Sequence, residues 1–197
     1  MLIFWKERLV FLSTPKTGST SVETALEPLA HVAIRRPPEL KHMSAGQYRR
    51  HFAPLLEAAA GQPFTTVAMM REPIDWLGSW YRYRQREDIV EHDRSTIGLS
   101  FEEAIEGHLG DPPSPSMAVG SQARFLCGQG DRPLVDRIFR YEDIADFVAF
   151  LEDRLDYEIV LPRLNVSPAR NLDLSPSVRV RLSTRLARDL AIYDRLG

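Results

Sequence analysis

The chain has a single cysteine, almost no net charge and no long apolar run among its 197 residues. Cys127 has no partner for an internal disulfide, which fits a thiol in a reducing compartment. The 25 Lys and Arg residues nearly balance the 27 Asp and Glu residues, which excludes nucleic-acid binding driven by net charge. No stretch is long and apolar enough to span a membrane, and the N-terminal segment lacks the long apolar region of a signal peptide. We therefore predict a cytoplasmic protein with no membrane span and no nucleic-acid partner.

The chain also lacks internal repeats and low-complexity segments, so its length and 44% hydrophobic content indicate one domain over residues 1–197. Apolar patterns of strand and helix type alternate along it. This alternation predicts a three-layer α/β fold, in which a mainly parallel central sheet is flanked by helices. Strands are expected near residues 8–13, 30–34, 64–70 and 134–140, and helices near 19–28, 45–59, 73–87, 100–108, 116–126, 144–155 and 175–194.

A phosphate-binding loop is predicted directly after the first of these strands. Residues 13–21 read Ser-Thr-Pro-Lys-Thr-Gly-Ser-Thr-Ser and lead into a helical pattern. Free backbone N–H groups, a helix N-terminus and the cation of Lys16 would together face an anion. The commonest phosphate loop, which ends in Gly-Lys-Ser or Gly-Lys-Thr, is absent because Lys16 precedes Gly18. The alternative is an ordinary turn, in which Gly18 supplies backbone freedom and Lys16 is solvated.

A second anion-binding segment is predicted after the strand near residues 64–70. This strand runs into Arg71-Glu72-Pro73, and Pro73 suits the first turn of a helix. Ser79 lies eight residues after Arg71, which is about two helical turns, so the two side chains could converge on one anion. Alternatively, Arg71 pairs with Glu72 or another carboxylate, and Ser79 is an ordinary helix residue.

In order and spacing, these two segments resemble the sulfotransferases that use 3'-phosphoadenosine 5'-phosphosulfate as donor. The resemblance implies a P-loop-like nucleotide-binding core, release of 3'-phosphoadenosine 5'-phosphate, and Lys16 as the cation at the leaving oxygen. No metal is expected, because no Asp or Glu cluster with metal-ligand spacing lies near the loops. Weaker likeness extends to residues 135–144 and 161–167, whereas the Arg-Lys-Gly triplet of some members is absent. The residues implied to bind the donor are Pro15, Lys16, Thr17, Gly18, Ser19, Thr20, Ser21, Arg71, Ser79, Asn165 and Ser167.

Transfer to an acceptor also needs a base, and His42 is the candidate. It lies in the segment Leu-Lys-His-Met-Ser, and a histidine needs little adjustment of its pKa to act as a base near neutral pH. Alternatively, His42 is a capping or surface residue, in which case Glu23 or Glu142 is the candidate carboxylate base. His51, within the helix expected near residues 45–59, is predicted to be a packed or surface residue.

The sequence also predicts which part of the chain would bind the acceptor. Residues 86–118 combine a charged stretch with a proline-rich loop and are predicted to form an acceptor-site or lid insertion. The family resemblance implies an acceptor hydroxyl or amine on a small molecule, a carbohydrate or a lipid, and the oligomeric state is open. Two other functions compete with sulfuryl transfer. One is a nucleoside or small-molecule kinase, disfavoured by the missing Gly-Lys-Ser/Thr order, and the other is a module that binds a nucleotide without catalysis.

Overall fold

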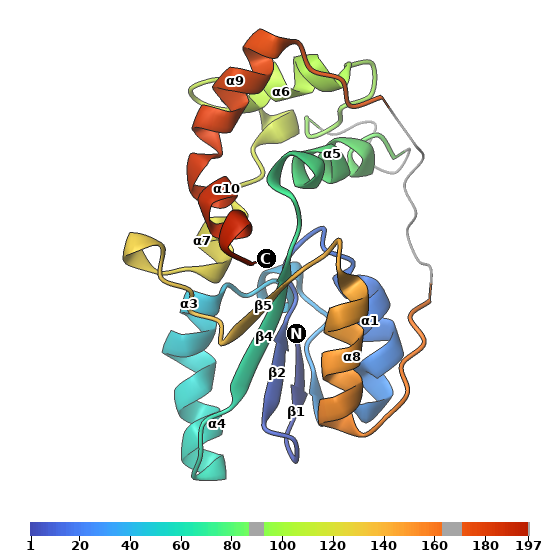
Figure 1. Cartoon of the computed structure of the whole chain (residues 1–197), viewed down its shortest axis with the longest axis vertical. Helices are drawn as coiled ribbons and strands as arrows, with labels where there is room; N and C mark the ends of the chain where they lie inside the picture. Colours follow the sequence, from blue (N-terminus) through green and yellow to red (C-terminus); the bar gives the residue numbers. More distant parts are fainter. Residues whose placement is uncertain (87–92, 163–170, 197) are drawn as a thin grey trace.

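The computed structural model describes residues 1–86, 93–162 and 171–196, and this part of the chain forms an α/β structure around a five-stranded sheet. Helices flank the sheet on both sides, and further helices lie beyond its upper end in Figure 1. The strands are β1 (Leu2–Phe4), β2 (Leu9–Leu12), β3 (Val32–Ala33), β4 (Thr65–Met70) and β5 (Arg137–Arg140).

The sheet is mixed, and the prediction of a mainly parallel sheet was wrong. The strand order is β3-β1-β2-β4-β5, in which β2, β4 and β5 pair in parallel while β1 pairs antiparallel with both β2 and β3. The difference arises from β1, a strand that the sequence patterns did not predict. Residues 5–8 alone join β1 to β2, and so short a connection can only link antiparallel neighbours. The parallel half of the sheet carries the two predicted anion-binding segments.

Alternate strand residues face opposite sides of the sheet and build two apolar cores. On one face, Phe11 and Met69 pack with side chains of α1 (Ser19–Leu26) and α8 (Ile144–Leu155). On the other face, Leu12 and Met70 pack with side chains of α4 (Ala53–Ala60) and α7 (Gln122–Leu126). These cores fix the strand ends from which both anion-binding segments begin.

A third apolar core lies beyond the upper end of the sheet, in a group of helices that we call the helical cap (Figure 1). Trp76 and Tyr81 pack there with Phe101 and Leu182. The cap covers the C-terminal ends of the parallel strands, which is the edge where α/β sheets usually bind ligands. The helices of the cap are α5 (Pro73–Tyr83), α6 (Phe101–Leu109), α9 (Pro176–Arg185) and α10 (Ala187–Tyr193).

Several predicted helices are shorter or interrupted, among them the one expected near residues 73–87, which ends at Tyr83. The helix expected near residues 45–59 contains a π-helical segment, Tyr48–Phe52, between α3 (Ala45–Gln47) and α4. The helix expected near 116–126 begins only at α7, because Gly120 adopts a φ of 76°. The helix expected near 175–194 divides at Leu186, whose ψ of 8° departs from helical values. The remaining short elements are α2 (Pro38–Lys41) and single 3₁₀ turns at Glu27–Leu29, Pro115–Met117, Gln129–Asp131 and Asp194–Leu196.

Candidate functional site

The loop between β2 and α1 is a concave turn lined by free amides. Lys16 and Gly18 both adopt positive φ, 64° and 70°, on either side of Thr17, and such alternation turns successive N–H groups toward one point. The amides of these three residues donate no hydrogen bond to any other described residue. The Thr17 side chain braces the turn from inside, since its hydroxyl donates to the Thr14 carbonyl at 3.0 Å. The loop therefore offers unused backbone donors, although the Thr17 hydroxyl itself points away from solvent.

The Thr14 hydroxyl is a further unused group in this region. Its Oγ1 is buried and has no hydrogen-bond partner among the described residues. A buried hydroxyl without a partner costs free energy, on the order of 1–3 kcal/mol. The free amides and the Thr14 hydroxyl together fit a site that is completed by an anion or by ordered water.

Lys16 extends from this loop onto the aromatic side of α5. Its Nζ lies 4.0 Å from the ring centroid of Tyr83 and 5.6 Å from that of Trp80. Burial of the ammonium group, together with the positive charges of Arg71, Arg86 and Arg82, lowers the pKa of Lys16 to about 8. The cation is thus held against aromatic rings in a strongly positive region, rather than being solvated as the ordinary-turn alternative requires.

Arg71 joins the second segment to the first. Its guanidinium donates to the Lys16 carbonyl at 3.2 Å and stacks on Tyr141, 4.6 Å from the ring centroid. It also donates to Asp75 Oδ2 at 2.6 Å, so Arg71 pairs with a carboxylate one helical turn ahead. Arg71 therefore does pair with a carboxylate, as the alternative interpretation predicted, and its partner is Asp75 rather than Glu72.

The pairing of Arg71 leaves a net positive charge around Asp75. Arg82 also reaches this carboxylate, at 3.3 Å between Nη2 and Oδ1, so two arginines share one acid. Asp75, Ser79 and Arg82 follow one another at helical spacing on a single face of α5. Ser79 is 7% exposed, and its hydroxyl forms no hydrogen bond with any residue that the structure describes. This face of α5 therefore has cationic and hydroxyl groups available to an anion.

Side chains outside the predicted site residues hold Arg71 and the loop through hydrogen bonds to their backbone groups. Gln122 of α7 is 1% exposed and clamps Arg71, accepting from its N–H at 2.9 Å and donating to its carbonyl at 2.8 Å. Trp76 Nε1 donates to the Pro15 carbonyl at 2.8 Å. Tyr141 covers Gly18 so closely that a Cβ there would lie 3.0 Å from the ring. Tyr141 falls within residues 135–144, where the sequence shows a weaker family likeness, whereas no local signal could have marked Gln122.

His42 lies beside the start of the loop, at the C-terminal end of α2. Its Nδ1 is 2.7 Å from the carbonyl oxygen of Ser13, the first residue after β2. Burial lowers the pKa of His42, while the hydrogen bond to the Ser13 carbonyl opposes this effect, so the ring is mainly neutral near pH 7. The histidine caps no helix through its side chain and is half-buried next to the loop, as a base in this site would need to be.

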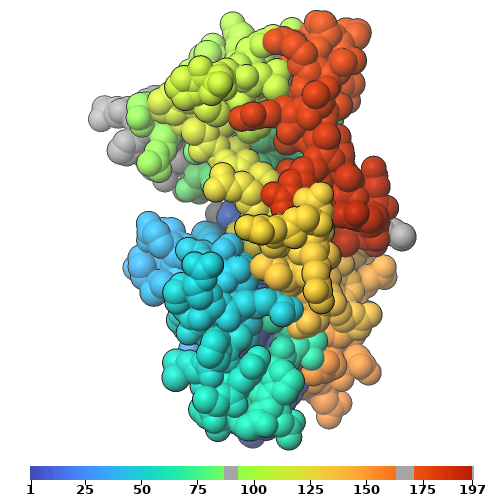
Figure 2. All heavy atoms as spheres, turned by 90° about the vertical axis from the view of Figure 1, so that its left-hand side faces the viewer, coloured from blue at the N-terminus to red at the C-terminus, as the bar shows by residue number. Residues whose placement is uncertain are grey.

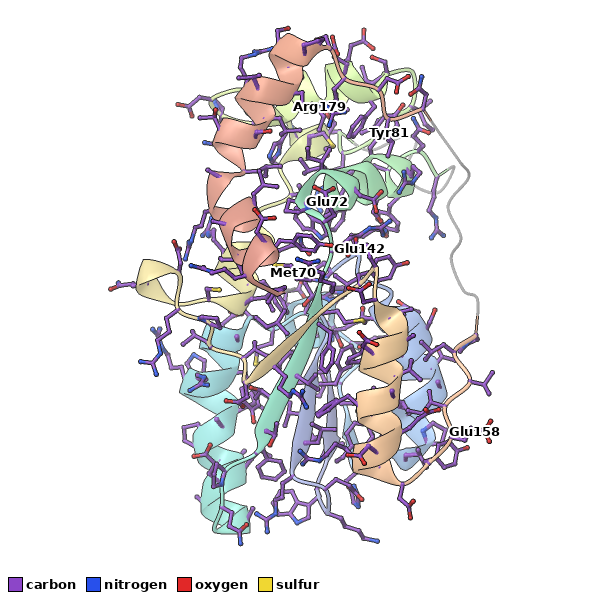
Figure 3. All side chains as sticks on the ribbon, viewed as in Figure 1. Met70, Glu72, Tyr81, Glu142, Glu158 and Arg179 are labelled. Carbon is purple, nitrogen blue, oxygen red and sulfur yellow. The ribbon has the colours of Figure 1, made fainter. Side chains whose placement is uncertain are left out.

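The two carboxylate alternatives occupy different positions. Glu23 is completely buried beneath the loop, so no acceptor can reach it. Glu142 lies beside Glu72 where β4 and β5 end, and both are labelled in Figure 3. Its carboxylate accepts from the Glu72 N–H at 2.9 Å and from the Tyr193 hydroxyl at 2.8 Å. Glu142 therefore ties the end of the sheet to the helical cap.

The structure thus brings the loop, Arg71 and His42 to one edge of the sheet, with Ser79 on the helix that follows Arg71. Asn165 and Ser167 lie outside the described residues. A separate hollow of about 270 Å³ lies at the opposite edge, lined by Tyr48, Thr66 and Asp136 among others, and it contains none of the predicted site residues.

In the described part of the chain, no helix has the length and apolar character needed to cross a membrane, and no group of three or more His, Cys, Asp or Glu side chains could hold a metal ion. No family model, curated protein or solved structure matches the chain. A function therefore has to be inferred from the chemistry of the site.

Proposed function

We propose that this protein transfers a sulfuryl group from 3'-phosphoadenosine 5'-phosphosulfate to a hydroxyl or amine of an acceptor, on a P-loop-like core formed by β2, its loop and α1. The observation that carries the proposal is the contact between Arg71 and the Lys16 carbonyl, at 3.2 Å. Because of this contact, the two segments that resemble donor-binding motifs border one site rather than two.

The loop after β2 is the proposed position of the 5'-phosphosulfate. The free amides of residues 16–18 and the first turn of α1 supply donors that an anion can share. Ser19 is 4% exposed, so the side chains left for direct contact are the half-buried Thr20 and Ser21. Because Lys16 precedes Gly18, its cation is proposed to reach the bridging oxygen between sulfur and phosphorus from the strand side.

The α5 face is the proposed position of the 3'-phosphate. Arg71 and Ser79 are the groups that the family resemblance implies, and Arg82 adds a second guanidinium beside them. Asp75 orients both arginines and leaves one uncompensated positive charge. A guanidinium held by a carboxylate can still donate its remaining N–H groups to a phosphate, because the fork carries five donors.

The proposed reaction is one in-line displacement. The acceptor oxygen or nitrogen forms a bond to sulfur while the bond from sulfur to the bridging oxygen breaks, and the bridging oxygen keeps the electron pair. His42 Nε2 takes the acceptor proton, and Lys16 stabilises the charge on the departing phosphate. Lys16 must leave the Tyr83 ring for this contact, which the flexible four-carbon side chain allows.

The acceptor is proposed to approach from the side shown in Figure 2. There the surface is indented between the light-blue segment, which includes α2 and α3, and the yellow-green segment of the helical cap. His42 directly follows α2, so we propose that an acceptor entering here reaches this base. A screen of small-molecule, carbohydrate and lipid acceptors would identify the class that this protein sulfates.

Calorimetric titration with 3'-phosphoadenosine 5'-phosphate tests the donor site, in parallel with adenosine 5'-phosphate and with ATP plus Mg²⁺. We expect a clear preference for the ligand with the 3'-phosphate. Arg71→Ala should weaken its binding by roughly 10- to 100-fold, since a charge-assisted hydrogen bond contributes about 1.5–3 kcal/mol.

Arg137→Ala is the matched control, because Arg137 also stacks on an aromatic ring at 4.6 Å but stands at the start of β5, away from the site. This variant should bind the ligand as the wild type does. Equal binding of adenosine 5'-phosphate would overturn the proposal, and a preference for ATP with Mg²⁺ would favour the kinase.

A further inference from the structure

Glu23 is a completely buried carboxylate in α1, directly beneath the loop of the proposed donor site. Its Oε1 accepts from the Ser13 hydroxyl at 2.6 Å and from the terminal ammonium of Met1 at 3.0 Å. Its Oε2 lies 2.8 Å from Lys41 Nζ. Burial opposes ionisation, but the close contacts of Lys41, Ser13 and the Met1 ammonium group with the carboxylate outweigh it and lower the pKa of Glu23. The carboxylate is therefore ionised and holds three separate segments together.

Two of these partners also determine the position of His42. Ser13 binds Glu23 through its hydroxyl and His42 through its carbonyl, at 2.7 Å from Nδ1. Lys41 is the residue that precedes His42 in the chain. The residue that contacts the His42 ring and the residue that precedes His42 in the chain are thus both bound to the Glu23 carboxylate.

The contact with Ser13 also determines which ring nitrogen carries the proton. A backbone carbonyl can only accept a hydrogen bond, so Nδ1 of His42 must be protonated to make it. In the neutral ring, Nε2 then has a free lone pair and is the nitrogen that can take a proton. His42 has the tautomer that a base acting through Nε2 needs.

We propose that Glu23 is a positioning residue, which holds Ser13 and Lys41 so that the Ser13 carbonyl keeps His42 in the Nδ1–H tautomer with Nε2 available as the base. The role of Nε2 as a base rests on the proposed function. The tautomer of His42 can be measured without any ligand. Without the buried carboxylate, the Ser13 hydroxyl and Lys41 lose their common anchor, and the ring is free to take the other tautomer.

The test is ¹⁵N NMR of histidine-labelled protein at a pH where the rings are neutral, with His42→Gln to assign the His42 signals. The structure provides internal references. His31 Nδ1 accepts from the Trp5 N–H at 3.1 Å, so His31 must carry its proton on Nε2. His108 Nδ1 lies 3.0 Å from the Met117 carbonyl, so His108 must resemble His42.

In the wild type we expect His42 to be protonated on Nδ1, and in Glu23→Gln and Ser13→Ala we expect the Nε2–H tautomer to increase at least severalfold. His108 should not change in either variant. The matched control is Glu27→Gln, which removes an exposed ion pair with Arg35 and should leave His42 unchanged. Ser13→Ala keeps the carbonyl and removes only the hydroxyl, so it decides the question if Glu23→Gln does not fold.

The proposal is overturned if wild-type His42 carries its proton on Nε2, or if its tautomer is the same in every folded variant. Titration with 3'-phosphoadenosine 5'-phosphate on the same samples separates the two levels of inference. A protein that shows the expected tautomers but does not bind this nucleotide would refute the proposed function and keep the positioning role of Glu23.

Discussion

Lys16 allows a direct test of whether the site is organised for function at the expense of stability. Its ammonium group is buried among three arginines, and its pKa falls from 10.5 to about 8 for this reason. The protonated form is therefore destabilised in the folded protein relative to the unfolded chain. A shift of this size corresponds to about 3 kcal/mol, because each pKa unit is about 1.4 kcal/mol.

Replacing Lys16 by Met removes the charge and keeps a flexible side chain of similar length. The loss of the contact with Tyr83 offsets part of the gain, by about 0.5–2 kcal/mol. We expect Lys16→Met to raise the free energy of unfolding at pH 7 by about 1–2 kcal/mol, or the midpoint of thermal unfolding by about 4 °C for a chain of this size. The positive φ at position 16 is common to both proteins and cancels in the comparison.

The gain should depend on pH in a defined direction. Between pH 8 and 10.5 the unfolded wild type binds more protons at Lys16 than the folded protein does, so wild-type stability rises relative to the variant. The advantage of the variant should therefore be greatest below about pH 8 and should fall steadily as the pH rises to about 10.5. Urea denaturation of both proteins across this range measures it, with Lys6→Met in the exposed β1–β2 turn as control. A variant that is less stable than wild type at pH 7, or a difference that does not change with pH, would refute the reasoning.

Two further substitutions test the loop and the attachment of the helical cap. Gly18→Ala should destabilise the protein by about 1–2 kcal/mol because of the positive φ, and further because the new Cβ would crowd the Tyr141 ring. It should also weaken binding of 3'-phosphoadenosine 5'-phosphate. Gly61→Ala is the control, because Gly61 has the same φ of 70° and an added Cβ there would meet nothing within 4 Å. Thermal unfolding of this variant should show only the backbone cost, and calorimetry should show unchanged affinity for the nucleotide. Asp189→Ala removes a buried carboxylate that accepts from Ser121 Oγ at 2.9 Å and from an α7 amide at 3.0 Å. Urea denaturation should show a loss of about 2–3 kcal/mol, and a loss below about 0.5 kcal/mol would contradict this account of how α10 holds α7.

Local sequence was sufficient for the segments that carry the candidate site. The apolar run before Ser13, the hydroxyl-rich loop and the helical spacing after Gly18 predicted β2, the loop and α1 in their observed order. Pro73 marked the start of α5 in the same way. These signals predict the elements correctly because each depends only on residues that are close together in the sequence.

Tertiary structure decided how these segments combine. The antiparallel β1 was missed because three apolar residues at the end of a chain are a weak strand signal, and its pairing with β2 made the sheet mixed. The anchoring of Arg71 by Gln122 joins residues 51 positions apart, and the tautomer of His42 depends on Ser13, 29 positions away. Such contacts depend on which segments are buried together, and no local pattern encodes that choice. The sequence by itself determined the chemical groups of this site, and only the packing of the sheet and the helical cap determined their partners, protonation and burial.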